Sequence, residues 1–494
     1  MTHEQPNRRA FLRNAALGAA SLALSPLAGG ARKRPNVLIL FTDDQRFDTV
    51  HELDNPDVRT PNMDRMVRAG TSFTRACIMG GSISAVCAPS RAMLMTGQTL
   101  WHVTDSIVEP KRAGRPPKPF VMFPEMFRKA GYATFGTGKW HNGERLFARC
   151  FDRGENIFFG GMSNHLEVPV HDFDPTGRYP KEKQRIGRKF SSELFADSTI
   201  RFLREYGEDK PFLAYTAFTA PHDPRMAPRE YVDMYPSEKI PVPGNFLPVH
   251  PFDNGEMKGR DESLAPWPRT PQIAREHIAA YYAMITHLDA QIGRVLDALE
   301  DTGRARDTIV MFAGDNGLAV GQHGLFGKQN LYDHSIRVPL VIGGAGLPRG
   351  QRAATLCYLL DLFPTLCDLT GLPIPETVEG RSLAPVLQDP DVRVRDSVYA
   401  AFRHFQRGLR TGEWKLIRYH VGGKDTTQLF DLAGDPLETR NLADNPNHAG
   451  RVSEMNALLK KWMRETGDPL DLDKPAWGYV AQAGVREGAG YADD

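Results

Sequence analysis

Four runs of consecutive apolar residues mark the first two thirds of the chain. They cover residues 36–42, 132–138, 211–220 and 308–314. Apolar runs of this length, without alternation of polar and apolar positions, are typical of strands that are buried on both faces of a mainly parallel sheet. The pattern therefore predicts four central strands, each of which ends in polar residues.

Helical periodicity separates these predicted strands. Residues 281–301 place apolar side chains on one helical face, at Ile285, Leu288, Ile292, Val295, Leu296 and Leu299. Residues 120–131 precede the second predicted strand and close with Gly131, a residue type that often follows the end of a helix. Strands that alternate with helices predict an α/β sheet covered by helices.

A different pattern begins near residue 389. Residues 397–405, 408–420 and 427–432 are typical of short antiparallel strands, and residues 449–467 are typical of a final helix. The apolar face of that helix consists of Val452, Met455, Leu458, Leu459 and Trp462. We therefore expect a large domain over residues 33–388 and a smaller α+β subdomain over residues 389–494.

The first 32 residues differ from the rest. Arg8 and Arg9 precede Phe11 and Leu12, and residues 15–31 are small and weakly apolar. This combination resembles a twin-arginine export signal, which is removed from the mature protein. A disordered basic start is the alternative. The resemblance implies an exported protein, periplasmic or secreted, without a membrane span in its mature form, because the stretch is too short and too weakly apolar for one.

Composition narrows the range of functions. The 494 residues are 41% hydrophobic and 24% charged, with a formal net charge of +1. These values are typical of a globular protein and offer no electrostatic basis for nucleic acid or an anionic membrane as a partner. Five cysteines without a C-x-x-C spacing argue against a disulfide scaffold and a structural zinc site. Inert buried thiols and one or two disulfides both stay open.

Side chains suited to chemistry follow the predicted strands. They are Asp43, Asp44, Lys139, His141, His222, Asp315 and Asn316. Because ligands of open α/β sheets bind beyond the carboxyl ends of the strands, we expect these side chains to meet. Each of them alone has a structural explanation, such as a helix cap or a turn. Together, the three aspartates and the asparagine predict a calcium or magnesium site rather than a zinc site.

A cysteine at a predicted helix start adds a second feature. Residues 85–97, AVCAPSRAMLMTG, place Cys87 two residues before Pro89, which suits a first helical turn. Helix N-termini favour anions, so Cys87 is either a reactive thiolate or a buried small residue. Cationic or proton-transferring side chains accompany the predicted metal site, namely Arg91, Lys139, His141, His222 and Lys328. Such groups around a divalent ion suit a tetrahedral oxyanion, whose leaving oxygen gains negative charge.

These residues carry a resemblance to the type I sulfatases. The segment CAPSRAMLMTG resembles the family signature, C-x-P-S-R followed by a helix that ends in T-G. Other segments match in the family's order: NVLILFTDDQ, GTGKWHNG, APHDP, AGDNGLAVGQHGLFGKQNLYDHSIRVPLVI, RTGEWKLI and QLFDLAGDPLETRNLAD. The similarity runs from about residue 35 to about residue 445. It implies the alkaline-phosphatase-like α/β sandwich, with a mainly parallel central sheet flanked by helices.

The resemblance also implies a nucleophile and a metal site. Cys87 would be oxidised to formylglycine by a formylglycine-generating enzyme, and the hydrate of that aldehyde would attack sulfur. One ion, calcium rather than magnesium, would bind to Asp43, Asp44, Asp315, Asn316 and the modified Cys87.

The remaining residues take their implied roles from the same family pattern. Arg91 would steady the formylglycine hydrate, and Lys139 and Lys328 would bind the sulfate oxygens. His141 would take the proton that lets the hydrate release sulfate. His222, together with Lys328, would assist the leaving oxygen.

The implied activity is hydrolysis of a sulfate ester, on a sulfated carbohydrate or an aryl sulfate. Residues 144–189 and 235–270 lack periodicity and are candidate specificity loops. Candidates for a sugar-binding wall are Trp101, His102, His165 and His171. Three alternatives stay open: a formylglycine-dependent phosphodiester or phosphonate ester hydrolase, an unmodified hydrolase that uses the Cys87 thiolate, and a binding protein without activity.

Overall fold

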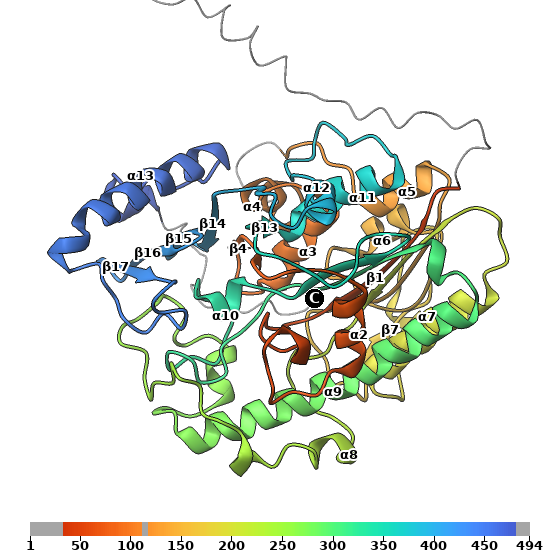
Figure 1. The fold of residues 1–494 in the computed structure, drawn as a ribbon, viewed down its shortest axis with the longest axis horizontal. Coiled ribbons are helices and arrows are strands. Elements are labelled where there is room, and N and C mark those ends of the chain that lie inside the picture. The colour runs from red at the N-terminus through yellow and green to blue at the C-terminus, as the bar shows by residue number, and fades with distance from the viewer. Residues whose placement is uncertain (1–32, 111–116, 481–494) are drawn as a thin grey trace, which may run out of the picture. The chain divides into compact units, whose positions relative to one another are not determined.

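The central sheet has eight strands, and the four predicted strands lie side by side in it (Figure 1). The structure, a computed structural model, describes residues 33–110 and 117–480. The predicted export signal lies outside these residues. The strand order is β12 (Gln351–Ala353), β2 (Gly70–Phe73), β11 (Leu340–Gly344), β10 (Thr308–Gly314), β1 (Asn36–Thr42), β9 (Phe212–Ala217), β5 (Ala133–Lys139) and β6 (Arg153–Phe158).

The middle of this sheet is parallel, as the apolar runs predict. β10, β1, β9, β5 and β6 pair in parallel, and β11 is antiparallel to β10 and to β2. Alternate residues of β1 enter two separate cores, with Leu38 and Leu40 on one face and Val37, Ile39 and Phe41 on the other. Burial on both faces explains why the sequence of β1 is apolar at consecutive positions.

Helices cover both faces of the sheet. α2 (Pro61–Ala69), α7 (Ser191–Glu205) and α9 (Pro271–Asp301) pack on one face, and α3 (Cys87–Thr96), α5 (Phe123–Lys129), α6 (Glu144–Cys150) and α11 (Leu362–Thr370) pack on the other. Figure 1 shows α7 and α9 across the sheet from α3 and α11. The predicted α/β class with a mainly parallel sheet is confirmed.

Two predicted helices differ in length from the observed ones. The helix predicted over residues 281–301 begins ten residues earlier, at Pro271, because the Thr270 hydroxyl caps it by accepting from the backbone N–H of Ile273. The helix predicted over residues 120–131 is the shorter α5, with Pro124 in its first turn. The described residues also contain the shorter α-helices α4 (Leu100–Val103), α8 (Arg229–Val232), α10 (Asp333–Ile336) and α12 (Ala384–Gln388).

A second, five-stranded sheet contains the predicted C-terminal strands. Its order is β17 (Lys424–Asp431), β16 (Trp414–Val421), β15 (Gln406–Thr411), β14 (Ser397–Phe402) and β4 (Gly80–Gly81). Residues 408–420 do not form the single predicted strand, because the chain reverses between β15 and β16 at Gly412 and Glu413. Two further sheets have two short strands each. β3 (Ala76–Cys77) pairs with β13 (Cys357–Tyr358), and β7 (Pro169–Val170) pairs with β8 (Arg185–Ile186).

The final helix, α13 (Ala449–Glu465), packs on this second sheet through Met455, Leu459 and Met463. β4 comes from the large predicted domain and pairs in parallel with β14. The division at residue 389 stays a prediction. Within the described residues, no helix combines the length and the apolar character that crossing a membrane requires. All five cysteines are buried free thiols.

Candidate active site

The predicted site residues come together where neighbouring parallel strands end. Asp43 and Asp44 follow β1, and Asp315 and Asn316 follow β10. Thr42 and Gly314 are register partners, so the two strands end at the same level. The Asp44 backbone N–H donates to Asp315 Oδ1 at 2.9 Å. Parallel register therefore brings these two pairs of residues into contact, as the sequence predicts.

Cys87 lies between two lysines at the first residue of α3. Its side chain is buried, with 2% exposure. Lys139 Nζ, at the end of β5, and Lys328 Nζ each donate to Cys87 Sγ at 3.4 Å. Burial alone would raise the pKa of Cys87, but the two lysines outweigh it and hold this pKa well below its ordinary value. The position therefore stabilises negative charge on its side chain.

Each lysine also pairs with an aspartate. Lys139 Nζ is 2.6 Å from Asp43 Oδ2, and Lys328 Nζ is 2.7 Å from Asp44 Oδ1. Burial and the neighbouring Asp315 raise the pKa of Asp43 well above its ordinary value, although Lys139 opposes them. Burial alone would also raise the pKa of Asp44, but His222 and Lys328 outweigh it and lower that pKa. The site is thus a buried set of alternating charges.

Arg91 lies one helical turn after Cys87 and is fully buried. Its Nε donates to Asp315 Oδ2 at 3.0 Å, and its Nη1 donates to the Lys139 carbonyl at 2.7 Å. The guanidinium therefore connects α3 to the ends of β10 and β5.

The two predicted histidines differ in charge. Burial would lower the pKa of His222, but Asp44, whose Oδ2 is 3.6 Å from Nε2, helps raise it to about 9. Burial lowers the pKa of His141, so this ring is neutral at pH 7. His141 has a positive φ of 57°. Among the described residues, its Nδ1 is buried without a hydrogen-bond partner. The site therefore offers one cationic and one neutral imidazole.

The oxygen atoms of this cluster fit a bound cation. Within the described part of the chain, Asp43 Oδ1 and Asn316 Oδ1 are buried and have no hydrogen-bond partner. Ligand atoms of Asp43, Asp44, Cys87 and His222 all lie within 4.8 Å of one another. A buried carboxylate oxygen and a buried amide oxygen, both without donors, are suited to a divalent cation that prefers oxygen ligands.

The four candidate sugar-binding residues are all buried. Trp101, His102, His165 and His171 are each at most 8% exposed. Trp101 Nε1 donates to the Tyr399 hydroxyl at 3.1 Å. These side chains lie inside the protein. The sequence alone does not distinguish an aromatic or histidine side chain that packs internally from one that binds a ligand.

His165 instead belongs to a buried hydrogen-bonded chain. Its Nε2 donates to the carbonyl of His222 at 2.9 Å, and its Nδ1 accepts from the Ser191 hydroxyl at 2.7 Å. The Thr219 hydroxyl donates to Ser191 Oγ at 2.7 Å. This chain connects the start of α7 to the main chain of His222.

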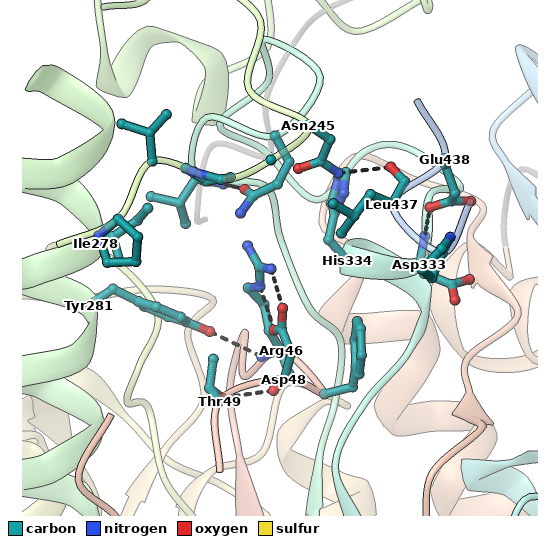
Figure 2. A pocket seen from close by; sticks show the side chains of 18 of the residues that line it. Arg46, Asp48, Thr49, Asn245, Ile278, Tyr281, Asp333, His334, Leu437 and Glu438 are labelled. Carbon is teal, nitrogen blue, oxygen red and sulfur yellow. Dashed lines mark hydrogen bonds and ion pairs between the residues drawn. The ribbon is translucent and has the colours of Figure 1, made fainter. Parts of the chain in front are cut away.

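A separate pocket adjoins the turn after β1 (Figure 2). It has a volume of about 290 Å³, and Arg46 lies inside it, paired with Asp48. The Tyr281 hydroxyl, on its wall, donates to the carbonyl of Asp44 at 2.6 Å. The pocket is therefore adjacent to the predicted metal site but is lined by a different set of residues.

Two residues near His222 were not predicted from the sequence. Asp223 accepts a hydrogen bond from His222 Nδ1 at its carbonyl oxygen, at 2.8 Å. Its carboxylate binds both terminal nitrogens of Arg260. Asp223 could have been noticed as the neighbour of His222, whereas Arg260 lies in a stretch without periodicity and carried no signal.

Comparison with known proteins supports the resemblance. The chain is 28% identical over 455 residues to an ulvan-active sulfatase of Formosa agariphila, covering 88% of this chain and 82% of that protein. A protein solved with its substrate D-glucosamine-2-N,6-O-disulfate matches with a TM-score of 0.74 and 22% identity, over 90% of this chain and all of that one. The phosphonate monoester hydrolase of Agrobacterium radiobacter matches with a TM-score of 0.69 and 23% identity, over 88% and 96% of the two chains. At these identities the two solved structures show a shared fold.

Family profiles cover most of the chain. The profile described as N-sulphoglucosamine sulphohydrolase, C-terminal, matches residues 321–465. The profile described as Sulfatase matches residues 35–372, a segment that includes every residue predicted for the site. The chain therefore belongs to the sulfatase family.

Proposed function

We propose that this sulfatase hydrolyses its sulfate ester with a formylglycine hydrate derived from Cys87. The observation that carries the proposal is the position of Cys87 at the start of α3, with the ammonium groups of Lys139 and Lys328 both 3.4 Å from Sγ. Formylglycine supplies two hydroxyl groups on one carbon, one to attack sulfur and one whose proton loss expels sulfate.

The charges around Cys87 suit an anionic ester. The carboxylates of Asp43, Asp44 and Asp315 are balanced by Lys139, Lys328 and Arg91, which pair with them. Addition of a divalent cation to this neutral set makes the site positive, which favours a sulfate monoester anion. Lys139 and Lys328 are placed to bind the sulfate oxygens, because both already reach the nucleophile position.

Two histidines are suited to the two proton transfers. His222 carries a proton at neutral pH and lies with Lys328 beside Asp44, so both can stabilise the leaving oxygen. His141 is neutral and contacts Cys87, so it can accept the proton of the second hydroxyl. Arg91 holds Asp315 and the end of β5 in place below the nucleophile.

Asp43, Asp44, Asp315 and Asn316, with the modified Cys87, would hold one calcium ion. The unpartnered oxygens of Asp43 and Asn316 support this assignment. The ion would supply positive charge to the sulfuryl oxygens. A formylglycine-generating enzyme is the partner that this chemistry requires during maturation.

We further propose a sulfated carbohydrate or an aryl sulfate as the substrate. A relative that acts on ulvan supports a carbohydrate. The twin-arginine pattern at Arg8 and Arg9 supports export to the periplasm or beyond.

The alternative function is hydrolysis of a phosphodiester or a phosphonate ester by the same site. The fold that this chain shares with a phosphonate monoester hydrolase is compatible with this alternative function. Sulfate and phosphonate esters are both tetrahedral oxyanions, so the site geometry fits either one. Assays with aryl sulfate, phosphodiester and phosphonate substrates distinguish the two functions. The sulfatase assignment requires the highest kcat/KM on a sulfate ester.

Peptide mass spectrometry across Cys87 tests the proposed nucleophile. The chain is produced together with a formylglycine-generating enzyme and digested. A mass loss that corresponds to conversion of the thiol to an aldehyde, with reactivity toward a hydrazide, is the expected result. Protein that turns over sulfate esters while Cys87 is fully unmodified would contradict the mechanism.

A further inference from the structure

The ring of His222 is held by the residue that follows it. His222 Nδ1 donates to the Asp223 carbonyl at 2.8 Å and lies 3.3 Å from Asp223 Oδ1. This contact occupies Nδ1, so Nε2 is the nitrogen left to face Asp44 and Cys87. The orientation of the imidazole therefore depends on where Asp223 lies.

Asp223 is in turn held by one arginine. Arg260 Nη1 donates to Asp223 Oδ2 at 2.6 Å, and Arg260 Nη2 donates to Asp223 Oδ1 at 2.9 Å. This two-point contact fixes the plane of the carboxylate, which a single ammonium group could not do. The Asp223 side chain is 6% exposed, so the pair is only partly screened by solvent.

The same arginine reaches the neighbourhood of Lys328. Arg260 Nη2 is 2.5 Å from Asp261 Oδ1, and Asp261 Oδ2 accepts from Gln329 Nε2 at 2.9 Å. Gln329 Oε1 accepts from the backbone N–H of Lys328 at 3.0 Å. One guanidinium thus connects the loop of His222 to the loop of Lys328.

We propose that Arg260 is a positioning residue that aligns His222 and Lys328, through Asp223 and Asp261, at the leaving oxygen of the ester. The inference rests on the proposed function, in which these two side chains assist that oxygen. Arg260 acts through other residues because both of its terminal nitrogens are already engaged by carboxylates. The expected defect is in the departure of the alcohol or phenol, with substrate binding preserved.

A leaving-group comparison tests this role. The variants Arg260→Ala and Arg260→Lys are produced with formylglycine conversion and assayed on phenyl sulfate and 4-nitrophenyl sulfate. Phenolate needs help to depart, whereas 4-nitrophenolate is a stable anion. For Arg260→Ala we expect kcat on phenyl sulfate to fall by about 10- to 100-fold, with KM within about twofold of the wild-type value. We expect kcat on 4-nitrophenyl sulfate to fall by less than about threefold.

The chain offers a matched control and a rescue. The side chain of Arg352 is 46% exposed, and that of Arg260 is 44% exposed. Arg352 also makes two contacts with one carboxylate, that of Asp54. Arg352→Ala should leave both rates unchanged because it lies on the edge strand β12. Added guanidinium should restore part of the phenyl sulfate rate to Arg260→Ala, since the side chain is partly exposed to solvent.

Two outcomes would overturn the inference. Equal losses on both substrates would indicate a general structural role for Arg260. A rise in KM with unchanged kcat would indicate direct contact with the substrate. Wild-type protein that hydrolyses neither aryl sulfates nor sulfated sugars would instead overturn the proposed function itself, which distinguishes the two failures.

Discussion

Cys87 is the one cysteine of the chain whose pKa falls, because two ammonium groups reach its sulfur. Burial raises the pKa of Cys77, Cys150, Cys357 and Cys367. The same residue type therefore has opposite electrostatics at different places in one fold. What distinguishes Cys87 is its neighbours.

Replacement of Cys87 by serine should trap the reaction after its first half. A serine carries a single hydroxyl, so a sulfated serine has no second hydroxyl whose proton loss expels sulfate. We expect steady-state turnover to fall by at least about a hundredfold, with one sulfuryl group retained per chain. Intact-mass spectrometry after incubation with substrate measures the adduct. Cys367→Ser is the control, and full turnover by Cys87→Ser would refute the need for a second hydroxyl.

His165 should make stability sensitive to mild acid. Burial lowers its pKa to about 4, against an ordinary value of 6.5. The unfolded chain therefore binds a proton below pH 6.5 that folded His165 takes up only near pH 4, so stability falls as the pH drops through this window. The group should account for about 2 kcal/mol between pH 7 and pH 5. Urea unfolding of wild type and His165→Gln measures it, and an identical pH dependence in both would contradict the assignment.

β5 delivers Lys139 to the site through an unusual backbone position. Gly138 has a φ of 86°, and the pairing of β5 with β6 shifts register between Gly136 and Gly138. A Cβ at Gly138 would lie 1.8 Å from the carbonyl oxygen of Ala217 on β9. Glycine at this position lets β5 and β9 stay paired while the chain turns Lys139 toward Cys87.

Comparison of Gly138→Ala with Gly131→Ala should separate the steric clash of the new Cβ from the cost of a positive φ. For Gly138→Ala we expect a loss of more than about 3 kcal/mol in the free energy of unfolding, because the backbone of β9 must move. The matched control is Gly131→Ala, whose φ is 92° and whose Cβ would meet no atom within 4 Å. This control should lose only about 1 kcal/mol, the penalty for positive φ. Equal losses in urea unfolding would show that the contact with Ala217 is unimportant.

Taken as a whole, the molecule concentrates charge at one end of its parallel strands. Three buried carboxylates meet there, and burial together with Asp315 raises the pKa of Asp43. A divalent cation would relieve this repulsion in the folded chain and would find no such site in the unfolded chain. Metal binding should therefore add to stability as well as to activity.

Removal of the metal should lower both the stability and the activity of the protein. Treatment with a chelator followed by dialysis should reduce sulfate ester turnover and the Tm, and calcium should restore both more fully than magnesium. Thermal unfolding followed by circular dichroism gives a readout that does not depend on activity. Unchanged Tm and turnover in chelated protein, verified by elemental analysis to lack metal, would count against the metal site.

Much of the site was accessible from sequence because its residues follow strands. Asp43, Lys139 and Asp315 come at or just after the ends of apolar runs, and parallel strands in register must end together. The family signature then placed Cys87 among them. The sequence did not indicate that His165, a candidate sugar contact, is buried against Ser191 and the His222 carbonyl. A histidine in an aperiodic loop has no pattern that shows whether it is buried.

The order of apolar runs and helices along the chain is a local property, and it was enough to predict the α/β sheet, its four central strands and the residues at their ends. Three features depend on the folded chain: the addition of β4 to the C-terminal sheet, the hydrogen bond of His165 to the His222 carbonyl, and the bridge from Asp223 to Arg260. Each joins segments far apart in sequence. Such contacts depend on the path of loops through space, which no local periodicity encodes.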